Sequence, residues 1–176
     1  RAPKGDHPDM SVTYVDSNVV HQNPLDLLEE LVGANEWAFD RAGSDEMAVE
    51  ISGRWCDYRL YFLWQEDLGA LHFSCLLESK VPVEKRREVS VLLTLLNEKL
   101  WLGHFDLGSD DGVPLYRHTL LVRGTGGVSV EQMEDLVEVA LSEAERFFPA
   151  FQFVIWGGKT AEEAVAASML DVAGEA

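Results

Sequence analysis

Two stretches in which every second residue is large and apolar constrain the fold of this chain more than any other feature. They cover residues 58–64 and 71–77, and the connection between them ends at Gly69. An apolar period of two predicts strands with one buried face, and a short connection with a glycine predicts an antiparallel hairpin. The predicted buried face holds Tyr58, Leu60, Phe62, Trp64, Leu71, Phe73, Cys75 and Leu77.

Further strands and helices follow from the same kind of pattern. Strands are predicted at residues 37–39, 47–51, 105–107 and 115–123. Apolar side chains at helical spacing predict helices at residues 24–33, 82–103, 133–148 and 161–170. Pro149 would ordinarily end or kink the third of these helices. We expect a kinked continuation from Phe151 to Ile155, although these residues also fit a strand.

Capping signals precede three of the predicted helices. Asn23 stands before Pro24, which suits an N-cap followed by a proline in the first turn. Ser129 and Gln132 have the spacing of a capping box, as does Thr160 with the glutamate three residues on.

The order of the predicted elements indicates the fold class. One helix, four strands, a helix, two strands and closing helices do not show the βα alternation of a doubly wound fold. We therefore predict an α+β fold in which helices flank an antiparallel sheet. We expect one domain at residues 23–176, preceded by a flexible arm at residues 1–22 that holds few large apolar side chains before Val12.

The charge of the chain restricts its partners. Asp and Glu number 31 against 14 Lys and Arg, which gives a formal net charge of -17. Such a surface repels phosphate backbones and anionic lipids, so we expect neither nucleic-acid nor membrane binding. A cationic segment of another protein is a more suitable partner. No stretch is apolar enough to span a bilayer, which predicts a cytoplasmic protein.

No catalytic or metal-binding pattern is evident. Cys56 and Cys75 lack CxxC spacing and are predicted to be free thiols. The sequence Gly158-Lys159-Thr160 matches the end of a phosphate-binding loop, but Phe153 stands where that motif requires a glycine. Three isolated histidines lack metal-site spacing, namely His72, His104 and His118. We therefore predict no cofactor, no metal and no enzymatic activity.

The outer face of the central hairpin is unusually apolar. It carries Arg59, Tyr61, Leu63, His72, Ser74 and Leu76. A fully solvated face does not need Tyr61 or Leu63, so this face either binds a partner or is covered by another part of the chain.

The segment PAFQFVIWGGKTAEEAVAA at residues 149–167 resembles the YbjN family of small bacterial domains, described as sensory transduction regulators. The order of elements agrees with this family, and the start NPLDLLEEL with a Trp-rich first hairpin resembles its alphaproteobacterial version. The resemblance implies a fold similar to type III secretion chaperones, with an α-β-β-β-α-β-β-α core that commonly forms homodimers. This chain has an additional strand near the N-terminus.

The resemblance and the charge together suggest a non-enzymatic regulator or chaperone-like adaptor that binds another protein. The candidate contact residues are Tyr61, Leu63, His72, Leu76 and Trp101. An alternative is a small-molecule sensor with a pocket lined by Trp37, Trp64 and Trp156. An enzyme whose residues meet only in space is a third, minor alternative.

Overall fold

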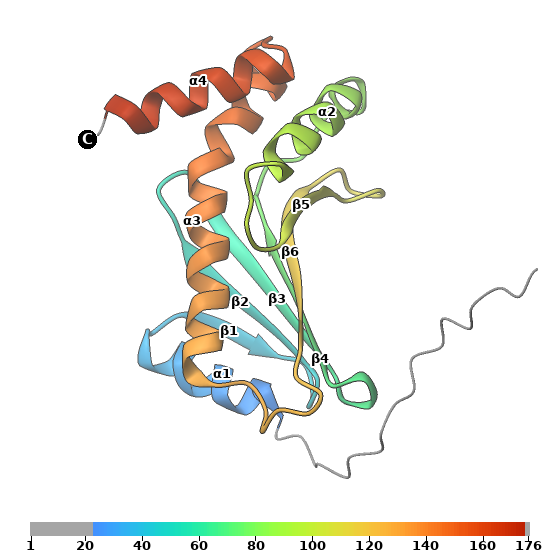
Figure 1. Ribbon diagram of the computed structural model, residues 1–176, viewed down its shortest axis with the longest axis vertical. Helices are drawn as coiled ribbons and strands as arrows, with labels where there is room; N and C mark the ends of the chain where they lie inside the picture. Colours follow the sequence, from blue (N-terminus) through green and yellow to red (C-terminus); the bar gives the residue numbers. More distant parts are fainter. Residues whose placement is uncertain (1–22, 175–176) are drawn as a thin grey trace, which may run out of the picture.

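The computed structural model describes residues 23–174, with side chains described as far as Leu170. Six strands form one antiparallel sheet in the order β1-β2-β3-β4-β6-β5 (Figure 1). The strands are β1 Ala38–Arg41, β2 Glu46–Ser52, β3 Asp57–Gln65, β4 Ala70–Leu76, β5 His104–Leu107 and β6 Pro114–Leu121. The predicted arm at residues 1–22 lies outside the described residues.

Four α-helices accompany the sheet, and the predicted α+β class and order of elements are confirmed. They are α1 Pro24–Ala34, α2 Arg86–Asn97, α3 Val130–Ile155 and α4 Ala161–Gly174. Two short 3-10 turns are η1 Glu66–Leu68 and η2 Val83–Lys85. Helices α1 and α3 lie against one face of the sheet, whereas α2 and α4 pack at the end of the molecule far from α1 (Figure 1).

The core lies between that face and the helices. All eight residues of the predicted buried face of β3 and β4 are buried, as alternation along a half-buried strand requires. Phe105 on β5 packs edge to face with Tyr116, Phe147 and Phe151, at ring-centroid distances of 5.8, 6.0 and 5.6 Å. This aromatic cluster joins the edge strand β5 to β6 and α3.

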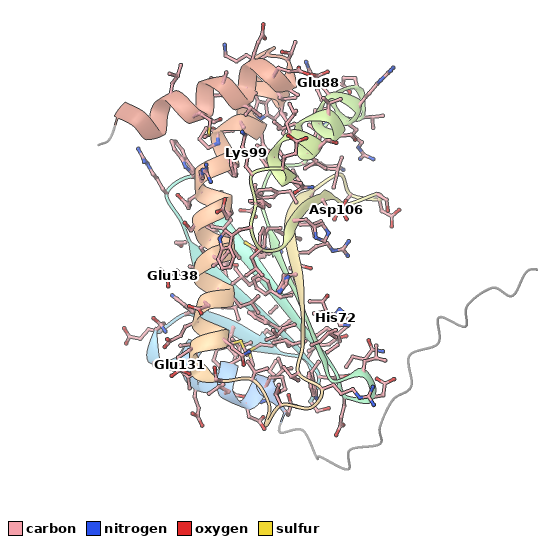
Figure 2. The ribbon with its side chains drawn as sticks, viewed as in Figure 1. His72, Glu88, Lys99, Asp106, Glu131 and Glu138 are labelled. Atoms are coloured by element: carbon pink, nitrogen blue, oxygen red, sulfur yellow. The ribbon has the colours of Figure 1, made fainter. Side chains whose placement is uncertain are left out.

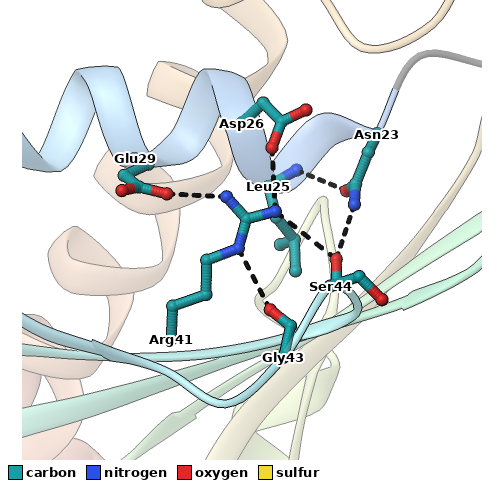
Figure 3. Close-up of polar contacts among 7 residues, drawn as sticks. All are labelled: Asn23, Leu25, Asp26, Glu29, Arg41, Gly43 and Ser44. Carbon is teal, nitrogen blue, oxygen red and sulfur yellow. Dashed lines mark hydrogen bonds and ion pairs between the residues drawn. The ribbon is translucent and has the colours of Figure 1, made fainter.

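Arg41 fastens α1 to the first hairpin (Figure 3). Its guanidinium donates to Glu29 at 2.6 Å and to Asp26 at 2.8 Å, and both carboxylates belong to α1. These hydrogen bonds stabilise the charged form and raise the pKa of Arg41. The predicted N-cap is confirmed, because the Asn23 side chain accepts from the Leu25 amide at 3.0 Å.

Helix α3 runs without a break through Pro149, so the predicted helical continuation is confirmed and the strand alternative is wrong. A proline has no N–H to donate to the carbonyl four residues earlier, which here belongs to Glu145. The indole Nε1–H of Trp55, in the β2–β3 loop, donates to that carbonyl at 3.1 Å. Trp55 thereby replaces the hydrogen bond that Pro149 removes.

Replacement of Trp55 by phenylalanine is expected to lower the free energy of unfolding by about 1 kcal/mol, the net contribution of one hydrogen bond. The loss should be much smaller in a Pro149→Ala background, because the alanine amide would donate to the Glu145 carbonyl within the helix. Urea unfolding of the four proteins in this double-mutant cycle measures the coupling. Equal losses in both backgrounds would show that the indole does not act through this carbonyl.

Several predicted boundaries are wrong. Helix α2 begins at Arg86 after a 3-10 turn and ends at Asn97, rather than spanning 82–103. It ends there because the Asn97 side chain donates to the Phe105 carbonyl at 3.1 Å and accepts from the Phe105 amide at 2.7 Å. Trp37 precedes β1 instead of belonging to it, and α4 extends to Gly174.

Candidate functional site

The face of the sheet that turns away from α1 and α3 is open. Along β3 and β4, Tyr61 pairs with Ser74 and Leu63 pairs with His72, so all four side chains share this face. Tyr61 is 42% exposed and Leu63 is 40% exposed. Within residues 23–174 no helix lies over this face of β3 and β4 (Figure 1), which agrees with the exposure of Tyr61 and Leu63.

A hollow of about 620 Å³ lies on the open face. Its shape follows from the cross-strand row Ala48, Tyr61 and Ser74, in which small side chains stand on both sides of a large one. Leu63 and His72 line the same hollow. A second hollow of about 300 Å³ continues toward the edge strand β1 and shares Ala48 and Tyr61 with the first.

The charges around the hollow leave an acidic rim. Arg117 donates to Asp106 at 2.8 Å, and Arg59 lies 3.9 Å from Glu50, so each of these arginines neutralises the charge of its own carboxylate partner. Asp40 and Glu46 also line the hollow. In the part of the chain that the structure describes, neither of these two carboxylates has a hydrogen-bond or ion-pair partner.

His72 is held by its neighbours, and Figure 2 labels it on β4. Its Nδ1 lies 3.1 Å from the Thr119 hydroxyl, and its Nε2 lies 3.2 Å from Oε1 of Gln65. Both ring nitrogens are therefore engaged in hydrogen bonds within the protein, which leaves neither of them free to bind a metal ion. The ring instead forms a fixed wall of the hollow.

The other two predicted contact residues lie outside the hollow. Leu76 shares the open face but is half-buried beside Leu115 on β6. Trp101 is 76% exposed and follows the end of α2 in the connection to β5, so the structure does not bring it together with Tyr61.

Sequence reasoning missed Asp40, Glu46 and Ala48, which complete the site from β1 and β2. The alternation of Met47, Val49 and Ile51 already placed the residues between them on the opposite face of β2. The missing information was the register that sets Ala48 beside Tyr61.

The three tryptophans of the predicted sensor pocket do not meet. Trp64 is buried in the core, while Trp37 lines a groove between α1 and α3. Trp156 is 72% exposed at the end of α3. The pocket was predicted between the sheet and the closing helices. Because α3 continues as one helix, Trp156 is carried away from the other two.

The two cysteine thiols are not arranged as activated nucleophiles. Burial raises the pKa of Cys75 to about 12 and also raises the pKa of Cys56, which disfavours both thiolates. Burial, with the nearby His104, lowers the pKa of His118. Among residues 23–174 no group of three His, Cys, Asp or Glu side chains is placed to hold a metal ion.

A single antiparallel sheet with helices on one face and an acidic, partly apolar hollow on the other defines a class of small α+β proteins with an open sheet surface. The chain belongs to the YbjN family, whose description is "putative bacterial sensory transduction regulator" and whose sequence model matches residues 24–153. The predicted family is thus confirmed. The match ends at Phe153, so most of the segment at 149–167 lies beyond it.

Two solved structures are similar to this chain. The crystal structure of YbjN from E. coli, described as a putative transcription regulator, is 16% identical, with 74% of this chain and 87% of that chain covered and a TM-score of 0.49. The ExsC–ExsE complex contains a chain that is 14% identical, with coverages of 68% and 86% and a TM-score of 0.43. No curated protein matches the sequence. No helix among residues 23–174 is both long and apolar enough to cross a bilayer.

Proposed function

We propose that this protein is a non-enzymatic, chaperone-like regulator that binds an extended, basic segment of another protein on the open face of its sheet. The observation that carries the proposal is the hollow in which Tyr61 and Leu63 remain exposed beside two unpaired carboxylates. Exposed aromatic and aliphatic side chains supply apolar contact area, and the acidic rim selects a cationic partner. The family description as a regulator supports a binding role.

An extended segment suits the shape of this surface. The two hollows run side by side across β1 to β4 and share the Tyr61 side chain between them. Alternate side chains of an extended peptide point the same way, so they can enter two neighbouring hollows. A lysine or arginine of the segment would reach Asp40 or Glu46 at the rim.

The double variant Tyr61→Ser, Leu63→Ser is expected to abolish partner capture while the protein stays folded. The reason is that both side chains are already half exposed, so their loss removes little core packing. The tagged protein is used to capture partners from a bacterial lysate at low and high salt, with mass spectrometry of the eluate. Circular dichroism and urea unfolding check the fold.

The matched control is Val83→Ser, Val91→Ser, which removes two exposed apolar side chains from η2 and α2. Proteins retained by the wild type and by this control, but lost from the Tyr61 and Leu63 variant, support the proposal. Release of these proteins at high salt would support the role of the acidic rim. Equal capture by all three forms, or unfolding of the Tyr61 and Leu63 variant, contradicts it.

Homodimer formation and a cytoplasmic location belong to the same proposal. Cys56 and Cys75 are free thiols, which suits a reducing compartment. Light scattering of the purified protein measures the oligomeric state.

A further inference from the structure

A second surface lies on the other side of the sheet, in a groove between α1 and α3. The groove measures about 530 Å³. Its floor is apolar and consists of Leu31, Trp37, Val137 and Leu141, while Glu134 and Glu138 form its rim on α3. We call these six residues the α1–α3 groove. The groove is separate from the open face, because α1 and α3 cover the opposite side of the sheet (Figure 1).

The floor of the groove is only partly used by the core. Val137 is buried, but Leu31, Trp37 and Leu141 are half-buried and pack against the core with part of their surface. Trp37 is held in place because its backbone amide donates to the Val32 carbonyl at 3.1 Å, just after α1 ends. The floor therefore presents aliphatic and indole surface in a fixed arrangement.

The rim carries negative charge that the fold does not neutralise. Between Val130 and Glu145, α3 holds six carboxylates before its first cation, Arg146. Glu134 and Glu138 are four residues apart, and a like-charge pair at this spacing destabilises a helix. Neither has a hydrogen-bond or ion-pair partner in the described part of the chain. Figure 2 labels Glu131 and Glu138 on the same helix.

We infer that the α1–α3 groove binds a basic amphipathic helix of a partner protein. Two helices wall the groove, so a helical occupant can pack its side chains between theirs, as neighbouring helices do. A helix satisfies its own backbone and lays an apolar stripe on the floor. Lysine or arginine side chains beside that stripe would pair with Glu134 and Glu138 and relieve their mutual repulsion.

The test uses the full chain and a fluorescein-labelled peptide of about 18 residues, a length that can form a helix. The peptide contains leucines at helical spacing with lysines on both flanks and alanines elsewhere. Fluorescence anisotropy at low salt gives its Kd for each protein. The variant Glu134→Gln, Glu138→Gln is expected to weaken binding by roughly five- to tenfold, since two rim ion pairs are lost.

The matched control, Glu84→Gln, Glu98→Gln, removes the same two charges near α2, at the end of the molecule far from α1. It should change Kd by less than about twofold, because surface changes away from a site have small effects. A peptide of the same composition with its leucines out of helical spacing should bind much more weakly.

Several results would overturn the inference. Equal weakening by the two glutamate variants, or equal binding of the scrambled peptide, would mean general attraction to an acidic surface. A change in oligomeric mass in the Glu134 and Glu138 variant would assign the groove to a second copy of the chain. Tighter peptide binding by a chain that begins at Asn23 would assign it to residues 1–22.

Discussion

Replacement of Phe105 by alanine is expected to lower the free energy of unfolding by about 3–5 kcal/mol, the usual cost of truncating a buried phenylalanine. Phe105 is 2% exposed and makes edge-to-face contacts with three other rings. Strand β5 pairs only with β6 in the described structure, and over four residues, so backbone pairing alone holds it weakly. The ring therefore fixes β5 to the core.

The matched control is Phe39→Ala. Phe39 occupies the corresponding place on the other four-residue edge strand, β1, but is 42% exposed. Its loss should cost less than about 1 kcal/mol, because a half-exposed side chain leaves no large cavity. Urea unfolding of both variants, with unchanged m-values, gives the comparison. Similar costs for the two variants would refute the assignment of Phe105 as the anchor of β5.

Local patterns were sufficient to predict most of the framework. The alternation in residues 58–77 placed Tyr61 and Leu63 on one face, because side chains on a strand point alternately to its two sides. Capping signals at Asn23 and Ser129 gave the starts of α1 and α3, because a cap forms within a few residues. The exposed surface that now carries the functional proposal was thus visible in the sequence.

Features that depend on distant partners could not be predicted in this way. The end of α2 depends on two hydrogen bonds between Asn97 and the backbone of Phe105, and the continuity of α3 depends on Trp55, which is 90 residues from Glu145 in the chain. The acidic rim depends on the register that places Asp40 opposite Ala48. None of these pairings leaves a periodic signal in the sequence.

The two proposed surfaces differ in the kind of protein segment that each would bind. The open face offers fixed side chains on a pleated sheet, whereas the α1–α3 groove offers an apolar channel between helices. Both are bordered by carboxylates that have no partner among the described residues. Each therefore favours a basic segment, but the open face suits an extended one and the groove suits a helical one.

Replacement of Gly103 by alanine is expected to lower the free energy of unfolding by about 2–5 kcal/mol. Gly103 has a φ of 66°, where an L-residue with a Cβ is strained by about 1–2 kcal/mol. An added Cβ would also overlap the phenol of Tyr116 and lie 2.9 Å from the Arg117 carbonyl oxygen. Tyr116 cannot move aside easily, because it is fully buried and its hydroxyl donates to the Leu102 carbonyl at 2.7 Å.

The variant Gly124→Ala separates the cost of backbone strain from the cost of steric overlap. Gly124 has a φ of 81°, but an added Cβ would meet no atom within 4 Å. Its replacement should therefore cost only the backbone strain of about 1–2 kcal/mol. Urea unfolding of both variants then gives the steric cost as the difference, expected at about 1–3 kcal/mol for an overpacked core. If Gly103→Ala costs no more than Gly124→Ala, then Tyr116 can give way, and the connection from α2 to β5 is not fixed by this close packing.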